Sequence, residues 1–174
     1  MVSKDLALFG IENELKKICD NDTTLSFRIS AKGPLNTGLK DQCIVYIEIS
    51  KREKVIEEAI PLKFDRPEYQ LPVKSLSGMA LDEVGAEKVR AITTREKARD
   101  IYDLYYLINN KKITFIKDLV NEKLRYYKTT FLKPKFLDEI KTKQNSYTKE
   151  LKGIIFDDLP DYKQVMAMIT MWVR

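Results

Sequence analysis

The pattern of apolar and polar positions divides the chain into a strand-rich first part and a helical second part. Between Ser3 and Asp20, apolar residues recur at a period near 3.6, which predicts a helix over that stretch. The next segments alternate apolar with polar residues or are apolar on both faces, and Pro61 and Pro72 mark sheet edges. Strands are predicted at 25–29, 43–49, 56–64 and 69–73.

From Ser75 onward the pattern becomes helical, with Pro134 and Pro160 marking the starts of two helices. Strands followed by helices favour an α+β fold with an antiparallel or mixed sheet. We expect an α/β portion over 1–76 and a helical portion over 77–174 packed on it as one unit. Helices are predicted at 79–94, 96–109, 112–127, 133–145 and 160–172, with a short one around 147–152.

The composition is that of a globular protein, because 44% of the 174 residues are hydrophobic and 33% are charged. No apolar run approaches the roughly 20 residues that a membrane span needs. The first ten residues lack the apolar core of a signal peptide, so we expect a cytoplasmic protein without membrane contact. Cys19 and Cys43 are expected to be buried thiols of a reducing compartment, not zinc ligands.

The sequence contains no histidine, which narrows the chemistry. Ser-His-Asp and Cys-His catalysis and His-ligated zinc are excluded for these residues. Any reaction would have to use carboxylates, Lys, Arg, Tyr or a metal held by oxygen.

The net charge of +5 is unevenly distributed. The section 111–152 carries twelve Lys and Arg against five Asp and Glu. Such a basic section suggests an anionic partner, namely RNA (including tRNA), a nucleotide or an acidic protein. A solvated lysine-rich surface explains the same charges, and the sequence does not decide between the two.

Ionisable residues stand within the two most apolar predicted helices. Lys88 lies in the middle of the apolar stripe of the helix at 79–94, with Arg95 on the same face. In the next helix Arg99 and Asp103 are four residues apart and close enough to pair, and Asp100 lies beside apolar positions. Two interpretations remain: a structural ion-pair network, or a cleft that binds an anion through Lys88.

Glu48 is an acid within the predicted strand at 43–49. A glutamate buried there would need a cation, either a basic side chain or a metal. Glu48 is therefore the best single candidate for a metal ligand, although Arg28 or Arg99 would also neutralise it.

The order of residues over 86–105, Ala-Glu-Lys-Val-Arg-Ala-Ile-Thr-Thr-Arg-Glu-Lys-Ala-Arg-Asp-Ile-Tyr-Asp-Leu-Tyr, resembles the AbiEii/AbiGii toxin family. The strand Cys-Ile-Val-Tyr-Ile-Glu-Ile-Ser-Lys-Arg-Glu at 43–53 resembles an upstream strand of the same family. The resemblance covers about 3–110. It implies a nucleotidyltransferase-like fold of the DNA-polymerase-β superfamily, from a toxin–antitoxin system.

That resemblance implies a transfer reaction in which carboxylates hold Mg²⁺ and position a nucleoside triphosphate for transfer to RNA or protein. By position, Asp5 matches the first metal carboxylate and Glu48 the third. Lys88 matches the lysine that contacts nucleotide phosphates, while Asp103 belongs to the catalytic set. Arg95, Arg99 and Asp100 are the remaining expected substrate-binding residues.

The chain departs from the family pattern at its start. Ala7 stands where the second metal carboxylate is expected, and the Gly-Gly/Ser turn that holds the triphosphate is missing. The chain is then a shortened or decayed homologue, a gene product whose start is assigned too late, or a fold kept for binding. We expect this polypeptide to be inactive rather than active as a transferase. The alternative function is a module that binds RNA or an antitoxin, and in a third interpretation all these charges form internal ion pairs.

Overall fold

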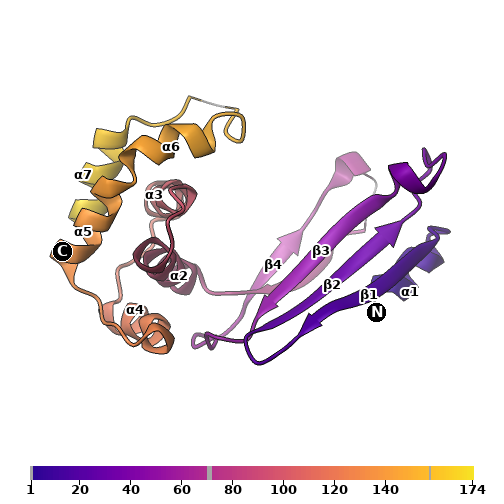
Figure 1. Ribbon diagram of the computed structural model, residues 1–174, viewed down its shortest axis with the longest axis horizontal. Coiled ribbons are helices and arrows are strands. Elements are labelled where there is room, and N and C mark those ends of the chain that lie inside the picture. The colour runs from indigo at the N-terminus through magenta and orange to yellow at the C-terminus, as the bar shows by residue number, and fades with distance from the viewer. Residues whose placement is uncertain (1, 70–71, 157) are drawn as a thin grey trace. The chain divides into compact units, whose positions relative to one another are not determined.

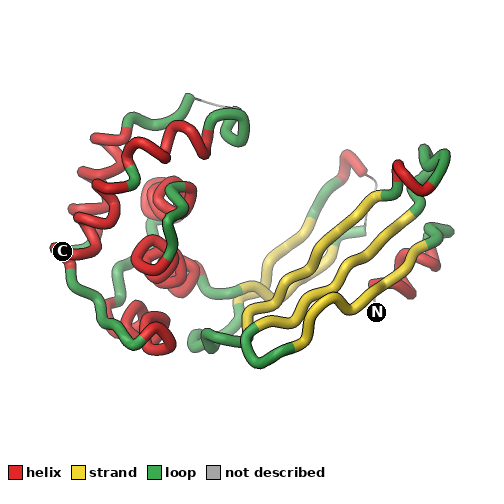
Figure 2. The backbone as a smooth tube through the Cα atoms, in the orientation of Figure 1, coloured by secondary structure: helices red, strands yellow, loops and turns green. Residues whose placement is uncertain are grey.

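The chain folds as two units of different character in the computed structural model, which describes residues 2–69, 72–156 and 158–174. The units are Met1–Lys54 and Val55–Arg174. Among the described residues there are seven α-helices and two antiparallel sheets, which confirms the α+β class (Figure 2). The division at residue 54 groups the segment 55–76 with the helices, whereas the sequence pattern grouped it with the preceding strands.

The first unit is a three-stranded antiparallel sheet with one short helix at its start (Figure 1). Asn21 closes the first turn, because its side-chain oxygen accepts the backbone N–H of Thr23 at 3.0 Å and of Thr24 at 2.8 Å. The elements are α1 (Val2–Leu8), β1 (Asn13–Asp20), β2 (Thr24–Ala31) and β3 (Cys43–Ser50), with β2 in the centre of the sheet.

The helix predicted from Ser3 to Asp20 is wrong beyond Leu8, because Gly10 ends α1. Gly10 adopts a left-handed φ of 73°, its N–H donates to the carbonyl of Ala7 at 3.0 Å, and the N–H of Ile11 reaches back to Leu6 at 3.0 Å. This pair of bonds is the Schellman motif, which stops a helix at a glycine. The apolar residues beyond it belong to β1, which pairs with β2 from Asn13 to Asp20.

Strand β3 lies at the expected place but is more exposed than its apolar sequence predicts. In the described sheet it pairs with β2 alone, so it is an edge strand. Tyr46 is 65% exposed, and Glu48 is also exposed. The expectation of buried thiols is also wrong: Cys43, the first residue of β3, is exposed and Cys19 is only half-buried, both as free cysteines.

The second unit begins with a hairpin of two short strands, β4 (Ile60–Phe64) and β5 (Lys74–Gly78). Strand β4 falls inside the predicted segment 56–64. The strand predicted at 69–73 is misplaced: a 3-10 turn, η2, occupies Pro67–Tyr69, residues 70 and 71 lie outside the described part, and β5 begins after Pro72. Proline has no N–H to give to a strand ladder, which explains why pairing starts beyond it.

The predicted helical series is confirmed, with differences of a few residues at the ends. A 3-10 turn, η3 (Arg125–Tyr127), extends α4 to the predicted end at residue 127, whereas the predicted start at 112 is wrong because α4 begins at Lys117. Helix α6 begins at Gln144, a few residues earlier than expected. The helices are α2 (Leu81–Thr94), α3 (Arg99–Lys111), α4 (Lys117–Leu124), α5 (Lys133–Thr142), α6 (Gln144–Leu151) and α7 (Tyr162–Trp172).

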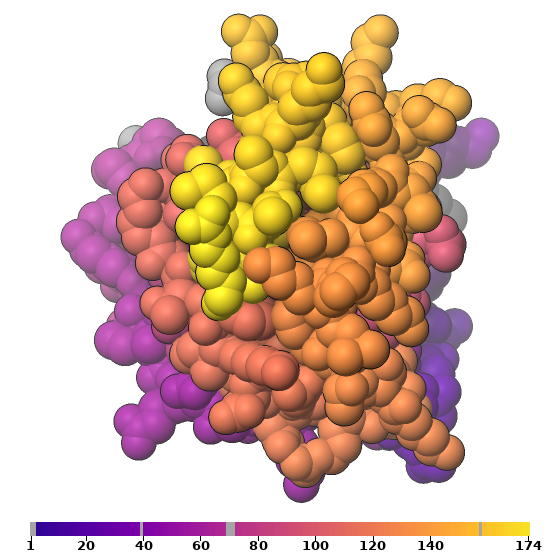
Figure 3. Space-filling view, turned by 90° about the vertical axis from the view of Figure 1, so that its left-hand side faces the viewer, coloured from indigo at the N-terminus to yellow at the C-terminus, as the bar shows by residue number. Residues whose placement is uncertain are grey.

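The core of the second unit lies between these helices. Val89 and Ile92 of α2 and Ile101 and Leu104 of α3 are completely buried. Figure 3 shows α7, in yellow, beside α5 and α6, in orange, and the Tyr162 hydroxyl links α7 to α5 by donating to the carbonyl of Ile140 at 2.5 Å. Among the described residues, no helix is long and apolar enough to cross a membrane.

Two buried or partly buried charges cap helix ends inside this core. The Lys143 ammonium donates to the carbonyl of Ile92 at 2.6 Å, in the last turn of α2. Glu150 accepts the N–H of Ala98 at 3.1 Å, at the start of α3. A cation at a helix C-terminus and an anion at an N-terminus both complement the helix dipole, so these side chains fix the two helices that carry the candidate site.

Candidate functional site

The sequence-predicted residues that the structure brings together are Lys88, Asp100 and Asp103, which we call the open cluster. The ammonium of Lys88, on α2, donates to Asp100 Oδ1 at 2.9 Å and to Asp103 Oδ2 at 2.5 Å, both on α3. Helices α2 and α3 pack on each other across a short connection, which places the three side chains side by side. The exposed fractions of these side chains are 27% for Lys88, 6% for Asp100 and 44% for Asp103.

The open cluster has more negative than positive charge. Burial alone would lower the pKa of Lys88, but the hydrogen bonds to Asp103 and Asp100 outweigh it and raise that pKa, so Lys88 stays protonated. Within the described residues the second oxygen of Asp100, Oδ2, is buried without a hydrogen-bond partner. An ammonium has three N–H groups, so Lys88 keeps one beyond its two bonds to aspartates. The cluster can therefore both donate to an anion and accept from a donor.

The two arginines expected near this site are exposed, and neither is bonded to the open cluster in the described structure. The pair expected between Arg99 and Asp103 is wrong, because Asp103 bonds to Lys88 instead. Arg99 begins α3 and is exposed, and Arg95, which follows the last residue of α2, is exposed as well. Both guanidinium groups are therefore open to solvent.

A second group of charges, which we call the closed cluster, was missed by the sequence analysis. The ammonium of Lys123, on α4, bonds to Glu83 and lies 3.2 Å from Glu87 Oε1, both on α2. Arg90 donates from Nη2 to Glu87 Oε2 at 2.7 Å, and its guanidinium lies 5.5 Å from the centre of the Tyr127 ring. The spacing of Glu83, Glu87 and Arg90 on one helix face was the available signal.

Glu83 is the most deeply buried acid of the closed cluster. Its carboxylate also accepts the backbone N–H groups of Ile56 at 2.8 Å and Glu57 at 2.9 Å. Burial alone would raise the pKa of Glu83, but the bond from Lys123 and these two N–H groups together lower it. The closed cluster therefore holds α2, α4 and the first residues of the second unit together.

Asp5 and Glu48, the two expected metal ligands, lie at different ends of the first unit's sheet. Helix α1 meets the start of β1, where Asn13 Nδ2 donates to the carbonyl of Ser3 at 3.0 Å. Glu48 lies on β3 opposite Ser26, whose other partner is Cys19. Cys19 is six residues beyond Asn13, which at about 3.3 Å per residue corresponds to roughly 20 Å along the sheet.

The first unit therefore does not fit a shared metal. Asp5 and Glu48 are both exposed, and Ala7, in the same helix as Asp5, offers no ligand. No group of three or more acidic or cysteine side chains suited to a metal occurs among the described residues. A magnesium ion held jointly by Asp5 and Glu48 is not supported by this arrangement.

The basic section 111–152 is only partly available to a partner. Lys123 and Lys143, two of its twelve basic residues, are buried in the second unit and bond to internal groups. The other lysines and Arg125 are exposed or half-buried. A surface for an anionic partner must therefore be sought among those residues.

Comparisons with known proteins agree with the fold. Residues 2–168 match the family described as nucleotidyl transferase AbiEii toxin, type IV TA system. The structure is similar to the crystal structure of JHP933 from Helicobacter pylori, with a TM-score of 0.50 and 15% identity over 94% of this chain and 63% of that one. A candidate nucleotidyltransferase from H. pylori gives the same TM-score and identity, over 94% of this chain and 65% of that one.

This chain thus spans less than two thirds of the length of both solved structures. At 15% identity the likeness shows the fold alone. A search of curated proteins gives no match.

Proposed function

The chain belongs to the nucleotidyl transferase AbiEii toxin family, and we propose that it binds a nucleoside triphosphate and transfers the nucleotide to a hydroxyl group of RNA or protein. The family is one of type IV toxin–antitoxin systems, so an antitoxin is its implied partner. The observation that carries the proposal is the open cluster, in which a lysine and two aspartates from two helices meet at a partly exposed place. Because nucleotides and RNA are cytoplasmic substrates, we propose that compartment for the activity.

In the proposed site Lys88 contacts a phosphate group with its remaining N–H. Asp100 and Asp103 keep this ammonium protonated and fixed, because both accept hydrogen bonds from it. Arg95 and Arg99 are exposed at the end of α2 and the start of α3, and they supply further positive charge for a triphosphate.

The proposed reaction is a displacement at the α-phosphorus. An acceptor hydroxyl oxygen forms a bond to that phosphorus, the bond to the bridging oxygen of the β-phosphate breaks, and pyrophosphate leaves with the electron pair. Negative charge accumulates on the leaving pyrophosphate, where Lys88, Arg95 and Arg99 stabilise it. Asp103, the more exposed aspartate, takes the proton of the acceptor hydroxyl. No step is assigned to a metal on Asp5 and Glu48, since the sheet holds these residues apart.

The test is a labelling assay with purified protein, Mg²⁺, each of the four labelled nucleoside triphosphates and total RNA. We expect label in RNA or protein with the unmodified chain and at least a tenfold loss with Lys88→Met. Lys97→Met is the matched control, because Lys97 is an exposed lysine of the α2–α3 connection outside the cluster. Equal labelling by Lys88→Met and the unmodified chain would exclude the proposed role of Lys88.

Glu48→Ala and Asp5→Asn extend the same assay to the residues that the family resemblance assigns to the metal. If Glu48 and Asp5 each bind a separate metal ion that the reaction needs, each substitution alone lowers labelling, and a higher Mg²⁺ concentration restores it. Labelling unaffected by both substitutions would remove Asp5 and Glu48 from the reaction.

The alternative is an inactive homologue that binds RNA or an antitoxin. The specific observation in its favour is the lack of a carboxylate at Ala7 together with the separation of Asp5 from Glu48. It predicts no labelling with any nucleotide, while RNA or the antitoxin still binds the purified chain. Any Lys88-dependent labelling would reject it.

A further inference from the structure

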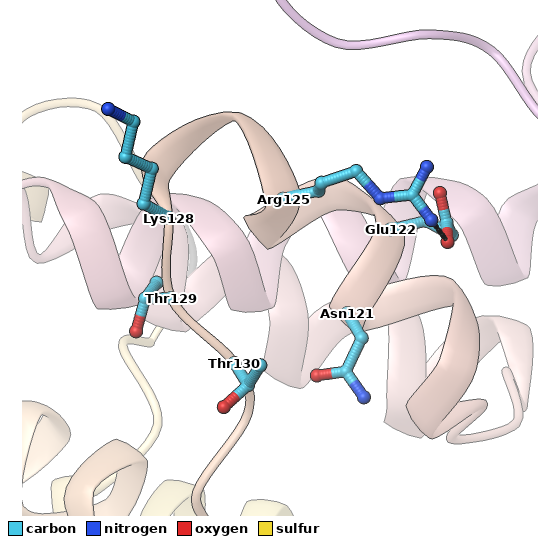
Figure 4. A pocket seen from close by; sticks show the side chains of 6 residues that line it. All are labelled: Asn121, Glu122, Arg125, Lys128, Thr129 and Thr130. Atoms are coloured by element: carbon cyan, nitrogen blue, oxygen red, sulfur yellow. Dashed lines mark hydrogen bonds and ion pairs between the residues drawn. The ribbon is translucent and has the colours of Figure 1, made fainter.

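The segment that follows α4 forms a hollow lined by basic and polar side chains. The turn η3 ends at Lys128, which has a left-handed φ of 53°, and the chain then reverses toward α5. The hollow has a volume of about 530 Å³ (Figure 4). It is lined by Asn121, Glu122, Arg125, Lys128, Thr129 and Thr130.

The backbone around this hollow is held in place from inside the unit. Asn121 Oδ1 accepts the N–H of Phe131 at 2.8 Å, and the N–H of Lys128 donates to the carbonyl of Arg125 at 3.0 Å. Phe131 is buried, with its ring centre 5.0 Å from that of Phe115 and 5.4 Å from that of Phe136. A surface fixed in this way loses little conformational freedom when a ligand binds.

The hollow lies in the most basic part of the chain. Between Lys111 and Lys135 there are eight Lys and Arg against two Asp and Glu, and seven of the eight remain for the surface because Lys123 is buried against Glu83. One of the two acids, Glu122, is already bonded to Arg125, and in Figure 4 the Lys128 side chain extends away from that pair. Because Glu122 offsets the charge of Arg125, Lys128 carries the net positive charge of the hollow, and this charge favours an anionic ligand.

An exposed aromatic residue lies between these two cations in the sequence of the turn. Tyr126 is 50% exposed and follows Arg125 directly, two residues before Lys128. The ring of Tyr126 meets that of Tyr127 edge-on at 5.2 Å, and Tyr127 itself lies under the Arg90 guanidinium. Tyr126 is thus supported on one side and open to solvent on the other.

An exposed aromatic ring between cations distinguishes among anionic ligands. An acidic peptide would use the cations but offers no planar group for the ring, and the bases of a duplex are already stacked on each other. A single strand offers both phosphates and unstacked bases, which stack on aromatic side chains regardless of sequence.

We infer that this surface, the η3 platform (Asn121, Arg125, Tyr126, Lys128, Thr129 and Thr130), binds single-stranded RNA, with one base stacked on Tyr126 and the backbone phosphates on Arg125, Lys128 and the threonine hydroxyls. Only the biological role of this binding, which is to hold an RNA acceptor for the transfer reaction, rests on the proposed function. The binding itself requires neither a nucleotide nor a reaction.

The experiment measures fluorescence anisotropy of a labelled single-stranded RNA oligonucleotide of mixed sequence with the full chain, without nucleoside triphosphate. We expect Tyr126→Ala to weaken binding on the order of tenfold. Lys128→Gln should weaken it and reduce the slope of log affinity against log salt by about 0.7. Tyr106→Ala and Lys163→Gln are matched controls, because both residues are exposed on other helices, and they should bind as the unmodified chain does. Circular dichroism confirms that each variant is folded.

Three further ligands sharpen the result: a duplex RNA, a single-stranded DNA of the same sequence, and polyglutamate. Binding of duplex RNA or polyglutamate as tight as that of single-stranded RNA would overturn the inference, as would Tyr126→Ala binding with unchanged affinity or no binding by the unmodified chain. If single-stranded DNA binds as tightly as single-stranded RNA, the platform binds single strands in general, and the inference that it is specific for RNA is overturned. Binding that depends on Tyr126 without any labelling activity would reject the proposed function but not the platform.

Discussion

The closed and the open cluster both use charged residues of α2, yet they differ in burial and in charge balance. The closed cluster joins two acids, Glu83 and Glu87, to two bases, Arg90 and Lys123, with Glu83 and Lys123 almost completely buried. The open cluster joins one base to two acids and is partly exposed. The first has balanced its charges inside the protein, whereas the second retains an excess negative charge at the surface.

This difference indicates which charges serve the fold and which are available for chemistry. A buried ion pair costs desolvation energy and is tolerated when its geometry and further hydrogen bonds are good, as they are around Glu83. A ligand cannot reach such a pair without unfolding part of the unit. The open cluster has solvent-facing atoms on Lys88 and Asp103, so a ligand can change its hydrogen bonding directly.

The largest effect that the comparison predicts is on stability, from Lys123→Met. This substitution leaves the carboxylate of Glu83 buried without its cation, and we expect a loss of about 3–5 kcal/mol in the free energy of unfolding. Urea denaturation of the unmodified chain and the variant measures it. Glu83→Gln combined with Lys123→Met should recover part of the loss, because the double variant no longer buries a lone charge.

A loss below about 1 kcal/mol for Lys123→Met would mean that the closed cluster is not the structural element that its burial suggests. Arg125→Met is a suitable control, since the Arg125–Glu122 pair is exposed on the same stretch of chain. An exposed pair contributes about 0–1 kcal/mol, so this variant should unfold close to the unmodified chain.

A smaller effect should separate the two aspartates of the open cluster. Asp100→Asn places an amide at a site that is 6% exposed and weakens the bond to Lys88, which we expect to cost about 1–2 kcal/mol of stability. Asp103→Asn changes a side chain that is 44% exposed and should cost less than about 1 kcal/mol. Urea denaturation again gives both values. The reverse order would show that Asp103, not Asp100, holds Lys88 in place.

The sequence predicted the helical part well and the start of the chain poorly, for local reasons. Long apolar periods, with prolines at helix starts, located the helices from α2 to α7. Over Ser3–Asp20 the same period was misleading, because Gly10 ends the helix and the following apolar residues pair as a strand. The glycine within this apparently helical stretch was the signal that should have been given more weight than the apolar periodicity.

The sequence singled out the residues of the open cluster, although it paired Asp103 with Arg99, and it missed the closed cluster. Lys88 stood out as a charge within an apolar stripe, and its partners follow 12 and 15 residues later on the next helix. Lys123 lies 40 residues from Glu83, and nothing in its own neighbourhood indicated that it is buried. The same distance effect explains why two basic residues of the section 111–152 were assigned to the surface.

The smallest predicted effect is a pH dependence of stability that has opposite sign for the two clusters. The pKa of Glu83 is lower in the folded chain than its ordinary value of 4.5, so its stabilising contribution is complete above that pH. The contribution is lost as pH falls through the folded pKa. The pKa of Lys88 is raised above 10.5, so its contribution is complete below that pH and is lost as pH rises through the folded pKa.

Urea denaturation at a series of pH values tests this prediction. The difference in the free energy of unfolding between the unmodified chain and a variant is used, because the titration of all other groups cancels in that difference. The stability gap between the unmodified chain and Glu83→Gln should narrow below about pH 4.5 and stay constant through neutral pH. The gap to Lys88→Met should stay constant through neutral pH and narrow only above about pH 10.5. A gap to Lys88→Met that already narrows near neutral pH would mean that Lys88 is not held protonated by Asp100 and Asp103. The open cluster would then lack the fixed cation on which its proposed contact with phosphate depends.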